Sequence, residues 1–265
     1  PITDIEGAMN NSWTGNVSTN WATAGNWSKN TVPDADEDVE IPNMTNDPVI
    51  TNGTGASCNN LTINSGASLT IQSGGSFIPS GSVTNNGTMT AQLFVTGGST
   101  DASDYTWHGI TLPTDDANAG TYFEGDYLYA YDEASNGWNN IVPSSSTLQQ
   151  GTGYLLKTVN GNKTYSFSGT LNNGSYTFNI SNSGADADHG YNYVGNPYPS
   201  YLDLLAVSGS NVSPVVYAWN PATENYISYN MGTQTGGLGR YLHPMQGVFV
   251  KVLGGSASGT ISMGH

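Results

Sequence analysis

The sequence predicts an all-β protein, and three observations carry that prediction. Only 9% of the 265 residues are charged, against about 25% in ordinary soluble proteins, so the charged side chains that form helices well are scarce. Thr, Val, Ile and Tyr favour strands, while the 34 glycines together with Asn and Ser favour turns. The hydrophobic residues, 36% of the chain, recur in short spaced groups, which is not the pattern of a disordered chain.

The charge and the cysteine content limit the cellular compartments and the classes of partner that fit the chain. Five Lys and Arg stand against 20 Asp and Glu, and the net charge of -15 predicts no nucleic-acid partner. No run of about 18 apolar residues is present, so we expect no membrane insertion. The single cysteine, Cys58, cannot form an internal disulfide and is predicted to be a small buried side chain. An exported bacterial protein fits these features better than a small disulfide-stabilised domain.

The sequence pattern of residues 1–98 predicts a short β-solenoid-like domain. Apolar-polar-apolar triplets alternate there with Gly-containing turns at a spacing of six to eight residues, as in stacked coils that are too short to be stable alone. A meander of hairpins with Asn-Gly turns is the alternative. The triplets and related pairs are Leu61-Thr62-Ile63, Leu69-Thr70-Ile71, Phe77-Ile78, Val83-Thr84 and Met89-Thr90.

The rest of the chain repeats itself, which predicts two homologous β-sandwich-like modules over 99–184 and 185–265. Four motifs keep their order in both copies, at offsets of 86 to 94 residues. A short helical turn is expected within Leu202–Val207. Lys157 and Lys251 occupy matching positions, and we interpret them as strand-end lysines that keep an edge soluble. The matched motifs are Tyr105, Trp107, Gly109 and Pro113 with Tyr191, Tyr193, Gly195 and Pro199; Tyr129–Tyr131 with Tyr217–Trp219; 153–157 with 247–251; and 168–170 with 258–260.

Two groups of residues resemble a known class of protein. The stretch from Asn20-Trp21 to Leu61-Thr62-Ile63 is similar to the amino-terminal part of large cell-surface proteins of the Bacteroidetes. Gly195–Pro199 and Gln246–Lys251 look like the module that often precedes their secretion signal. The resemblance implies export by the type IX system and an extracellular or cell-surface location. It implies scaffold or adhesive roles and names no reaction.

Catalytic signatures are not found in the sequence, so we expect no enzyme. It contains no nucleophile elbow, no zinc-protease motif and no phosphate-binding loop. The four histidines lie far apart in the chain and are interpreted as structural. Asp115-Asp116 and Asp132-Glu133 are the pairs that a glycosidase would need, but they lie among turn residues, where solvated acids are the simpler interpretation.

An acidic run offers the one candidate metal site. Asp34, Asp36, Asp38 and Glu40 alternate, so on an extended segment their carboxylates would point to one side and supply oxygen ligands to calcium. Asp186 and Asp188 form a weaker version of the pattern. The run lacks the Gly and distal Glu of an EF-hand loop, and the start of a strand is the alternative. No other cofactor is expected.

Aromatic residues offer a candidate carbohydrate site, because the C–H face of a sugar stacks on Trp and Tyr. We select Tyr131, Trp138, Trp219 and Tyr226 as the candidate residues. Alternate residues of a strand face opposite sides, so packing in the core is the competing interpretation.

Two functions remain. The first is a non-catalytic structural or adhesive surface protein that associates with itself or with other surface proteins, forming a fibre or layer through strand contacts. A first segment, Pro1 to Met9, is expected to be able to add a strand to a neighbour. The second is a carbohydrate-binding or accessory region of a larger secreted hydrolase, with glycans as partners.

Overall fold

The computed structural model of the chain describes residues 10–98, 106–114, 117–141, 146–184, 186 and 188–264. Strands dominate the regular structure of these residues, and the exceptions are short: the α-helix α1 (Ala119–Phe123) and the 3-10 turn η2 (Ala24–Asn26). The all-β prediction is confirmed. No helix in these ranges is long and apolar enough to cross a membrane. Pro1 to Met9, proposed as a donor strand, lies outside the described residues.

The chain folds into two units, which are described separately. The first comprises residues 1–93 and 166–173, and the second comprises 94–165 and 174–265. Residues 166–173, predicted as part of the module 99–184, pack in the first unit. There Ser168 Oγ lies 2.8 Å from Thr90 Oγ1, and the N–H of Gly169 donates to the carbonyl of Met89.

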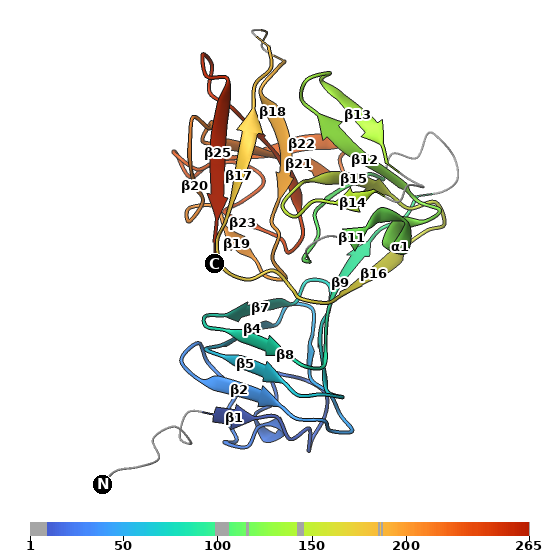
Figure 1. Ribbon diagram of the computed structural model, residues 1–265, viewed down its shortest axis with the longest axis vertical. Helices are drawn as coiled ribbons and strands as arrows, with labels where there is room; N and C mark the ends of the chain where they lie inside the picture. Colours follow the sequence, from blue (N-terminus) through green and yellow to red (C-terminus); the bar gives the residue numbers. More distant parts are fainter. Residues whose placement is uncertain are drawn as a thin grey trace. The chain divides into compact units, whose positions relative to one another are not determined.

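The first unit consists of short strands that pair in parallel. Val39 pairs with Leu61 and Leu61 with Val83 in one sheet, while Val49 pairs with Thr70 in a second, so each step covers 21 or 22 residues. Parallel pairing differs from that of the antiparallel hairpins that formed the alternative, and the β-solenoid stays a prediction. The strands are β1 (Asn10–Ser12), β2 (Asp38–Ile41), β3 (Val49–Ile50), β4 (Gly55–Cys58), β5 (Leu61–Ile63), β6 (Ser68–Ile71), β7 (Ser76–Pro79), β8 (Val83–Asn85) and residues 88–93 of β9 (Thr88–Val95), with residues 166–168 of β16 (Lys163–Ser168) joining from later in the chain. Figure 1 labels most of them.

The alternation of the triplets fixes the core of the first unit. Leu61 and Ile63 of β5 are buried, as are Leu69 and Ile71 of β6, while the threonine between each pair is half-buried. Side chains of one coil stack on those of the next, and burying each Leu or Ile contributes about 1.5–3 kcal/mol. No single coil is stable alone, so the stability comes from stacking.

Three tryptophans form a second core beside β1 and β2. Trp13, Trp21 and Trp27 are buried, and the Trp27 ring lies edge-on to both others, with centroid distances of 5.0 and 4.7 Å. The indole N–H of Trp27 donates to the Trp21 carbonyl at 2.8 Å. Trp21 also meets Phe77 of β7 at 5.6 Å. Residues from the start of the chain therefore cover side chains of the parallel sheets.

The second unit contains two sheets of the same order. One runs β10-β15-β12-β13 and the other β18-β24-β21-β22. A two-stranded pair accompanies each sheet, β11-β14 in the first copy and β19-β23 in the second. The strands of the first copy are β10 (His108–Ile110), β11 (Ala117–Asn118), β12 (Tyr127–Asp132), β13 (Gly137–Asn140), β14 (Thr147–Leu148) and β15 (Tyr154–Lys157). Those of the second are β18 (Tyr191–Gly195), β19 (Leu202–Asp203), β21 (Val215–Asn220), β22 (Asn225–Asn230), β23 (Tyr241–Leu242) and β24 (Gly247–Lys251).

A third sheet completes the second unit. It contains β17 (Tyr176–Ser181), β25 (Ser258–Met263) and β20 (Ser208–Ser210), in that order. Tyr198 is fully buried in the core of the second copy, and its hydroxyl donates to the carbonyls of Gly174 and Met263 at 2.6 and 2.8 Å. Both predicted modules lie in this unit except for residues 166–173, and their boundaries stay a prediction.

The strand registers match between the copies except at the first strand. Tyr129 pairs with Leu155 just as Tyr217 pairs with Phe249, as the sequence alignment requires. The predicted offset of 86 for the first strand is wrong by two residues, because Gly109 pairs with Leu155 whereas Tyr193 pairs with Phe249. A shift of two keeps the same side chains on the same face of the sheet.

Glycine permits the close approach of the two copies. The N–H of Gly153 donates to the Tyr193 carbonyl at 2.9 Å, and the N–H of Gly195 donates to the Gly151 carbonyl at 3.0 Å. A Cβ atom at Gly109 would come within 2.0 Å of the Tyr193 hydroxyl. The glycines that stand out in the repeat therefore mark where the two sheets meet.

The helical elements differ from the prediction. Leu202–Val207 holds the strand β19 followed by a turn, in which the N–H of Leu205 donates to the Asp203 carboxylate at 2.9 Å. Helix α1 was not expected. It begins after Asn118, whose side chain accepts from the N–H of Gly120 at 2.9 Å and caps the helix.

Candidate functional site

An aromatic pocket of about 360 Å³ lies between the two copies in the second unit. The β12-β13 hairpin of the first copy supplies one side, and four strands of the second copy supply the other. We call this set of residues the aromatic pocket: Tyr131, Asn136 and Trp138 from the hairpin, Tyr191 from β18, Tyr217 from β21, Tyr226 from β22 and Phe249 from β24.

The four predicted carbohydrate residues form two equivalent cross-strand pairs. Tyr131 lies opposite Trp138, with ring centroids 5.3 Å apart, and Trp219 lies opposite Tyr226 at 5.2 Å. Both pairs occupy the same position in their own copy. Tyr131, Trp138 and Tyr226 line the aromatic pocket, whereas Trp219 is not among its lining residues. Three of the four are therefore brought together.

Phe249 contacts rings from both copies. Its centroid lies 4.8 Å from that of Tyr131, 5.8 Å from that of Trp138 and 5.7 Å from that of Tyr226. The planes of these rings are inclined to Phe249 by 59° to 85°. The residue of the first copy that matches Phe249 is Leu155, as the shared register shows. Because the matching residue has no ring, the duplication alone does not produce this arrangement.

Besides four tyrosines, the aromatic pocket has one polar residue, Asn136, among the described residues that line it. Asn136 occupies a turn with φ +50°, and its amide oxygen accepts from the Tyr131 hydroxyl at 2.5 Å. Burial, reinforced by the charge of Glu133, raises the pKa of Tyr131. Burial likewise raises the pKa of Tyr226. Both side chains are therefore neutral phenols at ordinary pH.

The two matching lysines each contact an aromatic ring. Lys251 Nζ lies 4.2 Å from the ring centroid of Tyr191, and Lys157 Nζ lies 6.0 Å from that of Trp107. Lys157 is buried, so our interpretation of it as a solubilising edge residue is wrong. A cation-π contact explains why lysine recurs in both copies.

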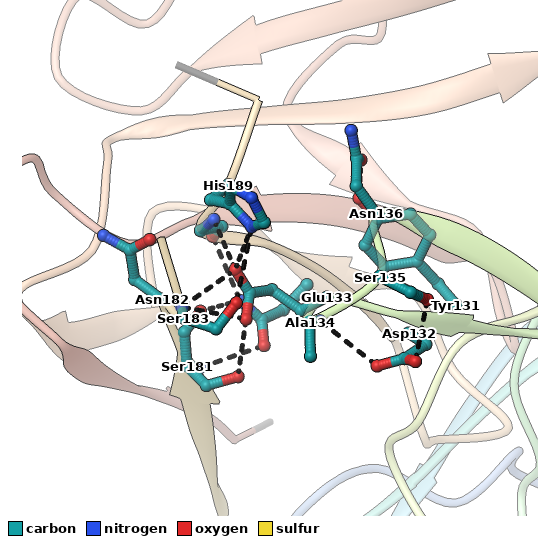
Figure 2. Close-up of polar contacts among 12 residues, drawn as sticks. Tyr131, Asp132, Glu133, Ala134, Ser135, Asn136, Ser181, Asn182, Ser183 and His189 are labelled. Atoms are coloured by element: carbon teal, nitrogen blue, oxygen red, sulfur yellow. Dashed lines mark hydrogen bonds and ion pairs between the residues drawn. The ribbon is translucent and has the colours of Figure 1, made fainter. Parts of the chain in front are cut away.

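Glu133 joins the two copies through a buried carboxylate beside the aromatic pocket (Figure 2). It accepts from the N–H of Gly190 at 2.8 Å and from the N–H of Ser183 at 3.1 and 3.0 Å. His189 Nδ1 lies 3.5 Å from the carboxylate. We call Glu133, Ser183, His189 and Gly190 the Glu133 clasp. The expectation that Glu133 is a solvated acid is wrong, because a loop of the second copy covers it.

Hydrogen bonding keeps Glu133 ionised. Burial opposes ionisation, but the bonds from Gly190 and Ser183 outweigh it and lower the pKa of Glu133. Its neighbour Asp132 points away and accepts from the N–H of Ala134 at 3.1 Å and the hydroxyl of Ser135 at 2.8 Å (Figure 2). The two carboxylates serve different hydrogen-bond networks, which does not suit a glycosidase pair.

The Glu133 clasp has the residue types of a nucleophilic triad but a different geometry. Ser183 Oγ lies 3.3 Å from His189 Nδ1, the same nitrogen that faces Glu133. A triad places the hydroxyl on one ring nitrogen and the acid on the other, so that a proton passes through the ring. This arrangement holds two segments together and has no path for such a transfer. The other nominated pair, Asp115-Asp116, lies outside the described residues.

The four acids of the acidic run do not gather into one cluster. Within the described part of the chain, no three His, Cys, Asp or Glu side chains gather as metal ligands. Asp38 accepts from the Asn60 amide at 2.8 Å, and Asn60 in turn accepts from Ser82 at 2.9 Å. Glu40 accepts from Asn64 at 2.8 Å. The carboxylates of β2 therefore accept from asparagines that flank the neighbouring strand β5, and the calcium site stays a prediction.

The remaining acids and histidines have local partners or are exposed. Asp34 accepts from the N–H of Asp36 at 3.0 Å, which forms a turn. Asp186 and Asp188 are exposed. His108 Nε2 lies 2.8 Å from the Thr96 carbonyl, and burial lowers the pKa of His108.

Sequence reasoning missed Asn136, Tyr191, Tyr217 and Phe249 as members of the aromatic pocket. Tyr191, Tyr217 and Phe249 lie in the same sheet as Tyr226, and only tertiary packing brings them to the hairpin that holds Asn136. One signal was available. Tyr217 and Phe249 both lie within the repeat motifs, and residues two apart on a strand share a face.

Fold and site define the class of protein: an all-β chain with a parallel-stranded first unit and a duplicated, aromatic second unit. The chain belongs to the family described as Domain of unknown function (DUF8693), which matches residues 12–92 and 75–263. Neither the curated proteins nor the solved structures gave a match.

Proposed function

We propose that the chain is a non-catalytic extracellular structural or adhesive surface protein, and that the aromatic pocket is its binding site. One observation carries the proposal: rings from both copies converge on Phe249, where the duplicated fold by itself would leave a leucine. The Glu133 clasp supports the proposal. The Glu133 carboxylate, which a glycosidase would use as a catalytic acid, is engaged by backbone N–H groups that fix the β12-β13 hairpin.

The adhesive function is tested with the whole chain immobilised on beads. Beads that carry the chain should bind to the surface that the native bacterium colonises, and a Tyr226→Leu variant should bind less. Tyr226 is 40% exposed, so this change should not unfold the protein. Equal binding by a bead coated with unrelated acidic protein would count against adhesion.

Export by the type IX system of a Bacteroidetes bacterium belongs to the same proposal. It is supported by the resemblance of Gly195–Pro199 and Gln246–Lys251 to the module that precedes secretion signals. Fractionation of the native bacterium tests it. The protein should be on the cell surface or in the medium, and it should stay in the cell when the export system is deleted. Unchanged surface display in the deletion strain would refute this part.

Assembly into a fibre or layer is supported by the edges of the repeated sheets. Strand β13 ends its sheet, and it carries Gly, Trp and Asn where charged residues would protect an edge. The edge of β22 is partly covered, because the N–H of Leu238 donates to the Ser228 carbonyl at 3.1 Å. Negative-stain images at high concentration should show filaments or sheets. Asn140→Lys on β13 should reduce them, whereas Thr223→Lys in an exposed turn should not. Monomers alone at every concentration would exclude assembly.

Carbohydrate binding is the second candidate function, favoured by the convergence of Tyr131, Trp138 and Tyr226 with the amide of Asn136. A glycan array with the whole chain tests it, together with tryptophan fluorescence on adding each positive glycan. No hits and no change in fluorescence would dispose of this candidate.

A further inference from the structure

The rings of the aromatic pocket surround a volume and do not form a flat platform. Tyr131 is inclined to Phe249 by 85°, Trp138 by 68° and Tyr226 by 59°. A sugar ring stacks best on one flat aromatic face. A rounded cation is attracted by the face of every ring that surrounds it, because each ring carries negative charge on its faces. The ring angles therefore favour a cation over a sugar.

The chain already pairs alkylammonium groups with rings of this layer. The Lys251 ammonium stands 4.2 Å from the centroid of Tyr191, which itself lines the aromatic pocket. Lys157 stands 6.0 Å from Trp107 in the first copy. These internal contacts have the ligand chemistry that we assign to the pocket.

The charge around the aromatic pocket is negative. The carboxylates of Glu133, Asp132 and Asp188 all act on the Tyr131 hydroxyl. The whole chain carries a net charge of -15, which raises the local concentration of cations at low ionic strength. Lys251 opposes this attraction from the side of Tyr191, but three carboxylates outnumber it.

Besides the Trp138 indole N–H, the polar groups of the aromatic pocket are four tyrosine hydroxyls and one amide. Asn136 is the one non-aromatic residue among the described residues that line it, and its amide oxygen already accepts from the Tyr131 hydroxyl, which engages two of these five groups with each other. A polyhydroxylated ligand needs several oriented hydrogen bonds, whereas a methylated ammonium needs none. At about 360 Å³ the pocket lies near the lower limit for small-molecule sites, which suits a compact group.

We infer that the aromatic pocket is a cage for an alkylammonium group, either a quaternary ammonium or a protonated amine. The inference rests on the proposed function, since it names the ligand class of the same site. It differs from the carbohydrate candidate in a testable way, because charge and not hydroxyl groups would be recognised.

Choline and its neutral isostere 3,3-dimethylbutan-1-ol test the inference, titrated separately into the whole chain by isothermal calorimetry. The two have the same shape and differ in charge. We expect choline to bind about tenfold more tightly, and added salt to weaken choline but not the alcohol. Equal affinities would overturn the inference, and so would no binding of choline.

Two tyrosine variants locate the binding. Tyr226→Leu removes a ring of the aromatic pocket, whereas Tyr127→Leu removes a similarly exposed tyrosine on β12 outside it. We expect the first variant to lose choline binding and the second to keep it, with circular dichroism showing that both are folded. Equal effects would place the binding elsewhere and overturn the inference.

Comparing choline binding with glycan and cell-surface binding separates failure of the inference from failure of the proposed function. Glycan or cell-surface binding that Tyr226→Leu abolishes, together with no choline binding, would refute the cage and retain the adhesive function. If the wild-type chain binds neither choline, nor a glycan, nor the cell surface, both the cage and the adhesive function are refuted.

Discussion

The carboxylate of Glu133 accepts a 2.8 Å hydrogen bond from the backbone N–H of Gly190 and so connects the first copy to the start of the second. Glu133 lies between Tyr131 and Asn136, at the turn of the hairpin that supplies one side of the aromatic pocket. A contact that fixes this turn also fixes those two side chains. Stability and binding are therefore coupled at this residue.

Replacing Glu133 should destabilise the second unit. Glu133→Gln removes the charge and places an amide N–H₂ where the N–H groups of Ser183 and Gly190 now donate. Leaving such buried donors unpaired costs about 1–3 kcal/mol. Urea unfolding followed by circular dichroism should show the loss.

Asp132→Asn is the matched control for Glu133→Gln. It makes the same chemical change at the adjacent residue, which serves a local turn, so we expect an effect within about 0.5 kcal/mol. Equal losses in the two variants would show that the Glu133 clasp has no special role.

Acid should weaken the protein through Glu133. The pKa of Glu133 is lowered in the folded state, so the unfolded chain binds the proton more tightly. Its contribution is complete above the ordinary pKa of glutamate, about 4.3, and is lost as the pH falls through the lowered value. As the pH is lowered from neutral to about 3, the melting temperature should fall more steeply for the wild type than for Glu133→Gln. Parallel curves would contradict this assignment.

Cys58 should be unreactive until the first unit unfolds. Its side chain is fully buried, and burial, with the charge of Asp38, raises the pKa of the thiol to about 12. The thiolate is the reactive form, so Ellman's reagent should label the native protein very slowly and the denatured protein at once. Because the chain has one cysteine, no correction for a second thiol is needed. Rapid labelling of the native protein would show that the coil opens.

The sequence predicts the strands of the first unit well, because the signal there is local. Leu61-Thr62-Ile63 alternates buried and half-buried side chains as the triplet requires. The duplication is also visible, since Tyr129 and Tyr217 keep the same partner position. The predicted offset of the first strand is wrong because it aligns Gly109 with Gly195 as matching glycines. Close packing between the copies requires glycine at both positions. Strand pairing instead matches Gly109 with Tyr193.

The site is less predictable than the strands, for a physical reason. Trp138 and Tyr226 are visible in the sequence as aromatic residues, but only tertiary packing places them around Phe249. Glu133 has the local sequence of an exposed turn. It becomes buried because Ser183, His189 and Gly190 lie against it, and no local sequence pattern predicts that contact.

Chelation of divalent metal should leave stability unchanged. The carboxylates of Asp38 and Glu40 are already engaged by asparagine amides of the next coil. We therefore expect the same melting temperature with excess EDTA and with added calcium. A rise with calcium that Asp36→Asn abolishes would restore the metal interpretation.

The tryptophan cluster should carry much of the stability of the first unit. Trp27 contacts Trp13 and Trp21 and donates to the Trp21 carbonyl. Trp27→Ala leaves a cavity in a closed core and should cost about 3–5 kcal/mol. Val17→Ala, at a side chain that is 65% exposed, should cost less than about 0.5 kcal/mol.

Because the chain has two units, its unfolding need not be a single transition. The transition in which Cys58 becomes reactive should therefore move to lower denaturant, while the transition reported by Glu133→Gln stays in place. A shift of both transitions would mean that the two units unfold as one.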